Sequence, residues 1–351
     1  MNTNLFEIAK TTLTDDNYLL EIIVFLLPLI LGLITSKIAI RFAKRVNLMD
    51  VPNRQPHKIH KFPTPIAGGT AIFLSLAVLS ALGILLLGKE LFDPYLFGAV
   101  LIIFGIGLYD DFIDISARQK LPAQLAASIL LILGNYQVNI LDSEPINILI
   151  SLVWFVGIIN AFNLIDSSDG LLLGISVTIC AFIVFASLNS NQALLNLISI
   201  GLFGLFIGIY TQNRYPAKLF LGDSGSMVIG LIFAIIALKY NPMGFDRTTS
   251  WISPILMMAF PIFDVTLVVV SRFMRKVPVF RGGLDHTYHR LGRMGRKKNF
   301  PFRAIIAVTL LLNILAFVNL YLPPIFSYTL FGIVVITGIT FLVYFEKREN
   351  R

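Results

Sequence analysis

The sequence predicts an all-α integral membrane protein that crosses the bilayer many times. Of its 351 residues, 56% are hydrophobic and only 14% are charged, and the mean hydropathy of +0.80 is far above that of a soluble domain. Apolar runs of membrane-crossing length alternate with loops that carry Lys and Arg. No linker, repeat or low-complexity segment divides residues 1–351, so we expect a single membrane domain.

Eleven apolar runs are long enough to cross, or nearly cross, a bilayer, which takes roughly 20 residues in a helix. The runs lie at about 19–40, 66–88, 94–109, 121–134, 146–164, 170–189, 193–211, 224–240, 251–271, 303–322 and 326–345. The first is expected to stay as a helix and not to act as a signal peptide, because the acids Glu7, Asp15, Asp16 and Glu21 outnumber Lys10 before it.

The distribution of basic residues predicts the orientation. Most of the 28 Lys and Arg residues fall in alternate loops and in the C-terminal tail, and such loops face the cytoplasm. We therefore expect the N-terminus outside and the C-terminus in the cytoplasm. The net charge of +8 then reflects loops beside anionic lipid, and no nucleic acid partner is expected. The single Cys180 excludes a disulfide framework.

The ionisable clusters all fall at predicted cytoplasmic helix ends. The first contains Asp110 and Asp111, with Asp114 one turn later and Lys120 before the next helix. Adjacent carboxylates repel, so a cation holds such a pair ionised or one member is protonated and can act as a base. The alternative is a helix end that dips into solvated headgroups.

The second cluster repeats every three residues: Asn160, Asn163, Asp166 and Asp169. This spacing places the four near one face of a continuing helix, or along a loop if the helix breaks. Amide and carboxylate oxygens without nearby bases suit a hard divalent ion such as Mg²⁺, or a hydrogen-bonded ligand. The alternative is a helix cap for the run that begins at Leu171.

A third cluster, Gly222-Asp223-Ser224-Gly225, opens another helix. The four-residue motif is weak alone and is also typical of an N-cap. A carboxylate at a helix N-terminus between glycines is nevertheless well placed to hold a metal that is bound to phosphates.

Two basic loops contain all four histidines of the chain. The first loop supplies Lys61 and Thr64, and the second supplies His286, His289 and Arg290. Part of this charge serves topology and lipid headgroups. Because histidine adds nothing to orientation at neutral pH, we expect the second loop to bind an anionic, phosphorylated substrate. Asp264 lies inside a predicted helix, where pairing with a neighbouring helix and a functional role are both open.

Acidic residues that can bind Mg²⁺, beside basic residues that can bind phosphate, predict phosphoryl transfer. A secondary transporter would instead place its ionisable groups near the midplane of the bilayer, often in repeated halves. A phosphatidyltransferase of the CDP-alcohol type would need an Asp-Gly-x-x-Ala-Arg signature, whereas Leu171, Leu172, Leu173 and Gly174 follow Asp169 and Gly170.

From about residue 50 to residue 291, the motifs in this order resemble those of the polyprenyl-phosphate N-acetylhexosamine-1-phosphate transferases. Phospho-muramoyl-pentapeptide transferase is a more distant relative of that family. The resemblance implies eleven helices with catalytic loops at about 41–65, 110–120, 160–170, 212–225 and 272–303. It also implies Mg²⁺, with Mn²⁺ as a substitute, and the substrates UDP-N-acetylhexosamine and polyprenyl phosphate.

The same resemblance implies roles for individual residues. Asp110 or Asp111 would help to activate the lipid phosphate, and Lys120 would contact the pyrophosphate. Asn163 and Asp223 would bind Mg²⁺. His286 and His289 would be catalytic residues as well. The residues implied to bind substrate are Lys61, Thr64, Asn160, Asp166, Asp169 and Arg290.

The resemblance implies a location in the inner membrane of a bacterium. It also implies the first membrane step of cell-wall, O-antigen or related surface-glycan synthesis, and a homodimer is an open alternative.

Two residues depart from the pattern: Ser167 replaces a usual Gly, and Tyr288 replaces the middle histidine of the last motif. Ser167 adds a side chain beside the implied nucleotide pocket, so N-acetylglucosamine is the first but not the only sugar to expect. Phospho-muramoyl-pentapeptide transfer and transport of an anionic solute stay as alternatives.

Overall fold

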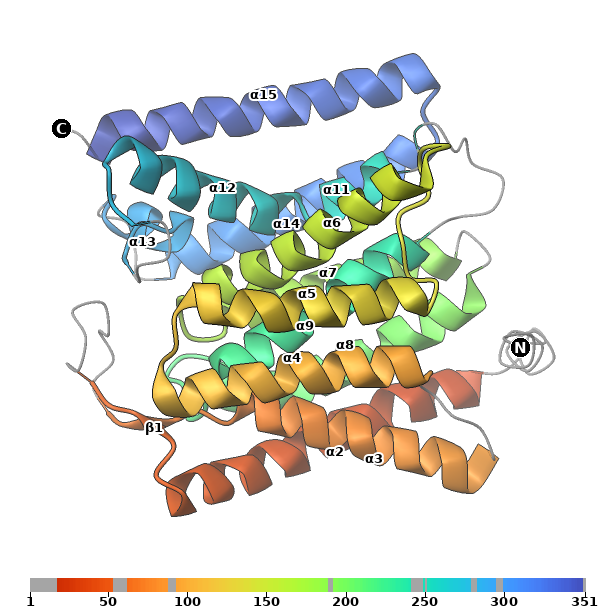
Figure 1. Ribbon diagram of the computed structural model, residues 1–351, viewed down its shortest axis with the longest axis vertical. Coiled ribbons are helices and arrows are strands. Elements are labelled where there is room, and N and C mark those ends of the chain that lie inside the picture. Colours follow the sequence, from red (N-terminus) through yellow and green to blue (C-terminus); the bar gives the residue numbers. More distant parts are fainter. Residues whose placement is uncertain are drawn as a thin grey trace.

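The computed structural model is a bundle of helices whose long axes run in broadly the same direction (Figure 1). It describes residues 18–52, 62–87, 93–188, 192–240, 249, 251–278, 283–294 and 299–349. Within these ranges nine helices are long and apolar enough to cross a membrane. The prediction of an all-α polytopic membrane protein is therefore confirmed. Helices suit this environment because each backbone polar group in hydrocarbon must find its hydrogen-bond partner within the protein.

Each of the eleven predicted runs coincides with helical structure. The nine long helices are α2 (Tyr18–Arg45), α3 (Gly68–Leu87), α4 (Pro94–Ile113), α6 (Glu144–Ile165), α7 (Leu171–Leu188), α8 (Ala193–Asn213), α9 (Gly222–Lys239), α14 (Phe300–Leu320) and α15 (Pro324–Glu349). A tenth run forms α5 (Ala117–Leu133), which has 17 residues. The number of crossings and their orientation stay predictions.

The run at 251–271 departs from the predicted single helix. It forms α11 (Ile252–Met257) and α12 (Ala259–Met274), which meet at Met258. Pro261 explains part of this break, because proline has no backbone N–H to donate to the preceding turn. The short helix α13 (Thr287–Gly292) follows α12.

Helix α9 lies at the centre of the bundle and α15 at its edge. In their most apolar windows, 72% of the residues of α9 are buried, against 6% in α15. Helix α9 contacts α3, α4, α6 and α11, and Figure 1 shows α15 along one side of the molecule. The first turn of α9 is therefore surrounded by other helix ends.

A two-stranded hairpin joins the N-terminal helices to this centre. Strands β1 (Met49–Asp50) and β2 (Thr64–Pro65) pair in antiparallel orientation. The chain after β2 is fixed to the segment before α9, because Gly68 N donates to Phe220 O at 2.9 Å and Phe220 N donates to Pro65 O at 2.9 Å. The hairpin thus lies beside the N-terminus of α9.

Candidate active site

The predicted carboxylates meet at one end of the bundle, where α4 ends and α9 begins. Asp110 and Asp111 are in the last turn of α4, and Asp223 is in the first turn of α9. One ligand oxygen from each of the three lies within 4.8 Å of the others, so together they could hold a metal ion. Residues 112 positions apart in the sequence therefore form one acidic group, which we call the aspartate cluster (Asp110, Asp111 and Asp223).

The close approach of α4 to α9 depends on two glycines. A Cβ on Gly107 would lie 2.5 Å from the Cα of Ser224, so only glycine allows the two backbones to touch. Gly222 has φ +70° and faces Asp111, whose Oδ1 would be 2.6 Å from an added Cβ. The glycine of the Gly-Asp-Ser-Gly motif thus serves both the left-handed turn and the packing of the carboxylate.

Lys120 is the cation nearest to the cluster among the described residues. Its Nζ lies 3.3 Å from Asp110 Oδ2 and donates a short hydrogen bond to Asp223 Oδ2. The side chains of Lys120 and Asp110 are only 12% and 11% exposed. One ammonium group therefore faces three clustered carboxylates, which leaves an excess of negative charge in a partly desolvated place.

Asp111 and Asp110 have different partners. Both oxygens of Asp111 accept hydrogen bonds from the start of α9: Asp223 N donates at 2.7 Å, Ser224 N at 3.2 Å and Ser224 Oγ at 2.5 Å. Asp111 therefore caps a helix to which it does not belong. Asp110 accepts Ile115 N through Oδ1 and faces Lys120 with Oδ2, so Asp110 is the better placed of the two to act on a substrate.

The second predicted cluster lies at the C-terminal end of α6, which ends before Asp166. Burial, followed by the charges of Asp223, Asp111 and Asp169, raises the pKa of Asp166 to about 8. Asp169 Oδ2 accepts Ala217 N at 2.9 Å and so ties this loop to the segment that leads into α9. These aspartates belong to the same electrostatic site as the aspartate cluster.

The two asparagines of that motif face different neighbours. Asn163 Nδ2 donates to Ser226 Oγ at 3.0 Å, one turn into α9, which is compatible with its expected place beside a metal on Asp223. Asn160 instead exchanges hydrogen bonds with Gln124 of α5, at 2.8 and 3.4 Å. Both ends of its amide thus contact α5, and the expected role of Asn160 in substrate binding stays a prediction.

The histidine segment, residues 283–293, lies at the same end of the bundle as the C-terminus of α4 (Figure 1). His286 Nδ1 lies 2.9 Å from Asp264 Oδ2 of α12. Burial lowers the pKa of His289 to about 4, and the nearby His286 and Arg293 add to this shift. Burial thus favours the neutral form of His289 in the folded protein.

Arg290 is buried between three elements. Its side chain is 1% exposed, and its guanidinium donates to Glu346 Oε1 at 2.7 Å, Ser271 Oγ at 2.8 Å and Asp285 O at 2.7 Å. These contacts fix the histidine segment to α12 and α15. The expected role of Arg290 in substrate binding stays a prediction.

The first basic loop is described in part. Lys61 lies outside the described residues, whereas Thr64 is buried in β2 and its hydroxyl donates to Phe62 O at 3.1 Å. Among features missed from the sequence, Ser224 stands in the quoted motif and Ser226 directly follows it, so both could have been found there. Glu346, Gln124 and Ala217 could not, because their partners are 36 to 56 residues away.

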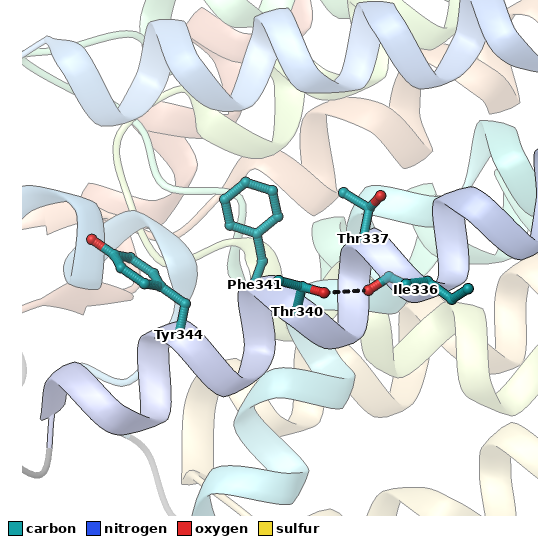
Figure 2. A pocket seen from close by; sticks show the side chains of 5 residues that line it. All are labelled: Ile336, Thr337, Thr340, Phe341 and Tyr344. Carbon is teal, nitrogen blue, oxygen red and sulfur yellow. Dashed lines mark hydrogen bonds between the residues drawn. The ribbon is translucent and has the colours of Figure 1, made fainter.

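A hollow on the described surface lies apart from the aspartate cluster. A groove of about 300 Å³ runs along α15 between Ile336 and Tyr344 (Figure 2). Its only drawn hydrogen bond joins Thr340 to the backbone of Ile336 in the same helix. The groove offers no acid or base, so the aspartate cluster is the candidate active site.

The fold and the site define a class of protein: a polytopic membrane protein that has an acidic site, able to hold a metal ion, at one end of its helices. Residues 94–241 match glycosyl transferase family 4. A probable undecaprenyl-phosphate N-acetylglucosaminyl 1-phosphate transferase of Bacillus subtilis (strain 168) is 28% identical over 87% of this chain and 86% of its own length.

Two further relatives reach 30% identity. A decaprenyl-phosphate N-acetylglucosaminephosphotransferase of Mycolicibacterium smegmatis is aligned over 74% of this chain and 72% of its own. A phospho-N-acetylmuramoyl-pentapeptide-transferase of Prochlorococcus marinus is aligned over 68% and 74%. The chain belongs to glycosyl transferase family 4, and it is a membrane-bound transferase.

Proposed function

We propose that the chain transfers N-acetylhexosamine 1-phosphate from a UDP-sugar to polyprenyl phosphate, giving polyprenyl-diphospho-N-acetylhexosamine and UMP. N-acetylglucosamine is the first candidate for the sugar, since it is named for two of the relatives above. The observation that carries the proposal is the aspartate cluster with Lys120 at its edge. Such a site suits the transfer of a phosphorylated group between anionic reactants.

The reaction exchanges one phosphorus–oxygen bond for another. A phosphate oxygen of polyprenyl phosphate attacks the β-phosphorus of the UDP-sugar, and the bond from that phosphorus to the bridging oxygen breaks. UMP leaves with the bridging oxygen and its electron pair. When the lipid phosphate is a dianion, no proton is needed for balance, and a monoester phosphate is largely in that state at neutral pH.

The residues at the site suit Mg²⁺, because the carboxylates of Asp110, Asp111 and Asp223 and the amide of Asn163 are hard oxygen donors. We propose Asp223 as the principal ligand and Asn163 as a second one. When bound, the ion neutralises charge on the diphosphate and on the departing UMP.

The remaining roles follow from the contacts. Lys120 reaches both Asp110 and Asp223, so it can turn its ammonium group to an incoming diphosphate. Asp110, at the surface of the cluster, orients the lipid phosphate. Asp111 keeps the first turn of α9 in place through its three accepted hydrogen bonds, and Asp166 and Asp169 complete the acidic rim on the side of the nucleotide.

The proposed location is the inner membrane of a bacterium, with the site at the cytoplasmic face. The helix ends that carry the aspartate cluster adjoin the loops in which Lys and Arg are concentrated. A soluble sugar nucleotide and a lipid-bound acceptor can meet only where the bilayer ends, and this end of the bundle is such a boundary.

The test is to reconstitute the purified protein with undecaprenyl phosphate, Mg²⁺ and a panel of UDP-sugars, and to measure UMP release and the mass of the lipid product. UDP-N-acetylglucosamine or another UDP-N-acetylhexosamine is expected to give UMP and a diphospholipid. Turnover of UDP-N-acetylmuramoyl-pentapeptide alone would assign the alternative family reaction. No UMP from any donor would contradict the proposal.

A further inference from the structure

The histidine segment is held in place by three contacts between an acidic and a basic side chain, and two of them flank His286. Before it, Asp285 accepts two hydrogen bonds from Arg272, at 2.7 and 2.8 Å. After it, Arg290 is paired with Glu346 at 2.7 Å. The two parallel hydrogen bonds between Arg272 and Asp285 fix both position and direction. The backbone around His286 is thus fixed by groups outside the aspartate cluster.

The third pair joins His286 itself to Asp264. Asp264 is 2% exposed, and its two oxygens accept Thr287 N at 2.8 Å and face His286 Nδ1 at 2.9 Å. An ionised carboxylate can only accept hydrogen bonds. The imidazole must therefore carry a proton on Nδ1 to make this contact, and Nε2 is left as the second nitrogen of the ring.

Among the residues that the structure describes, the hydrogen bond of the His286 ring is the one at Nδ1, to Asp264. The charged or titratable groups around the ring are Asp264 on α12, His289 at a ring-centroid distance of 6.4 Å, and Asp285, which Arg272 neutralises. The only carboxylate bonded to the ring is thus the one on Nδ1. A ring held in this way can take up a proton at Nε2, because the buried carboxylate stabilises the resulting imidazolium.

From this geometry we infer that Asp264 is a positioning residue: it fixes the tautomer of His286 so that Nε2 accepts a proton from, and then donates a hydrogen bond to, a phosphate of the substrate. The inference rests on the proposed function. A polyprenyl phosphate that arrives as a monoanion gives its P–OH proton to Nε2, becomes the dianionic nucleophile, and leaves a cation beside it. No other reactant is required.

Asp264→Asn gives a sharp test because Thr287 N–H already donates to one of the two carboxylate oxygens of Asp264. The asparagine must turn its oxygen toward that donor, so its NH₂ group faces His286 Nδ1. Nδ1 must then accept, and the neutral ring carries its proton on Nε2. The substitution keeps size and shape while it inverts the tautomer, and in serine proteases such an inversion costs on the order of 10⁴-fold in rate.

His286→Asn is the matched partner variant. Its amide NH₂ can still donate to Asp264 from the position of Nδ1, but it has no group at the position of Nε2. Stability that depends on the contact with Asp264 is then retained while the proposed proton acceptor is lost. Thr266→Val, on the exposed side of the same helix, is the control for substitutions in α12.

The experiment combines ¹⁵N-histidine solid-state NMR with UMP release, on the full-length protein in lipid. In the wild type, Nδ1 of His286 is expected to carry a proton, whereas in Asp264→Asn the neutral ring has its proton on Nε2. Asp264→Asn and His286→Asn are expected to lower kcat at least 100-fold, with KM for the UDP-sugar within about threefold and little change in the melting temperature. Thr266→Val should match the wild type.

Two results would overturn the inference: an Nδ1 without a proton in the wild type, or full kcat in either asparagine variant. If the wild type itself releases no UMP, the proposed function fails, and the NMR result still decides separately whether Asp264 sets the tautomer. The two failures are thus distinguishable.

Discussion

The aspartate cluster and the histidine segment differ in how many of their acidic side chains are paired with a basic one. In the cluster, three carboxylates share one ammonium group, Lys120. In and around the histidine segment, three acids each contact a basic side chain: Asp285 contacts Arg272, Asp264 of α12 contacts His286, and Glu346 of α15 contacts Arg290. Unbalanced charge is costly in a partly buried place unless a ligand completes it, whereas balanced charge fixes geometry. The first region is therefore built to bind, and the second to hold a side chain still.

The largest effect is expected where charge is unbalanced. Asp223→Asn keeps the shape of the first turn of α9 but removes the proposed principal metal ligand. Transfer should fall on the order of 10³-fold or more, as for the loss of a group that stabilises developing charge, while the amount of membrane-inserted protein stays normal. UMP release per inserted protein measures this, with Asp142→Asn, an exposed acid in a loop, as control. Robust activity in Asp223→Asn would remove the metal assignment.

In the balanced region, the largest effect is expected on stability. Glu346→Gln leaves the buried Arg290 guanidinium without its carboxylate, and such a loss costs about 3–5 kcal/mol of unfolding free energy. Thermal denaturation in detergent should show a clearly lower midpoint, with KM for the UDP-sugar unchanged. A double variant, Arg290→Met with Glu346→Leu, should recover much of the loss. A KM increase without loss of stability would place Arg290 at the substrate site.

A smaller effect tests the burial of His289 through pH. Burial, with the charges of His286 and Arg293, lowers the pKa of His289 to about 4 in the folded protein, against about 6.5 in the unfolded chain. Between these values only the unfolded chain takes up the proton, so stability is complete above pH 6.5 and falls as pH falls toward 4. The loss from pH 7 to pH 5 is about 2 kcal/mol.

Thermal midpoints of the wild type and of His289→Gln over this pH range measure that contribution. The glutamine cannot take up a proton, so its midpoint should fall less on acidification. Equal slopes for the two proteins would show that His289 is accessible to protons in the folded state.

The smallest effect separates the two adjacent aspartates of α4. Asp111→Asn weakens the cap of α9, since its amide NH₂ faces the donors of Asp223 or Ser224, and about 1–2 kcal/mol of stability should be lost. Asp110→Asn should leave the thermal midpoint near that of the wild type and act on kcat instead. Comparison of midpoint and kcat in the two variants checks this division, and the reverse pattern would exchange the roles of Asp110 and Asp111.

The sequence predicted the helices well, because lipid imposes length and apolarity on every crossing. It also predicted the aspartate cluster, since Asp110, Asp111 and Asp223 stand at helix ends on one predicted side. The break at Met258 was not predicted, although Pro261 in the same run has no backbone N–H. The use of Asp111 as a cap for α9 and the burial of Arg290 against Glu346 could not be predicted, because they depend on contacts between segments far apart in the chain.

Two residues of the predicted site make contacts between helices. Asn160 and Arg290 are polar groups in motifs rich in site residues, and sequence alone does not distinguish a polar side chain that faces a ligand from one that faces another helix. Their partners, Gln124 and Glu346, lie 36 and 56 residues away in the sequence. Only the folded structure shows that these side chains are in contact.

The central claim is that the unbalanced charge of the aspartate cluster is completed by a divalent ion, and Mn²⁺ binding followed by electron paramagnetic resonance tests it directly. The protein in lipid should bind Mn²⁺ in competition with Mg²⁺, Asp223→Asn should weaken this binding at least tenfold, and Asp142→Asn should not. Equal binding by the wild type and Asp223→Asn would contradict the account.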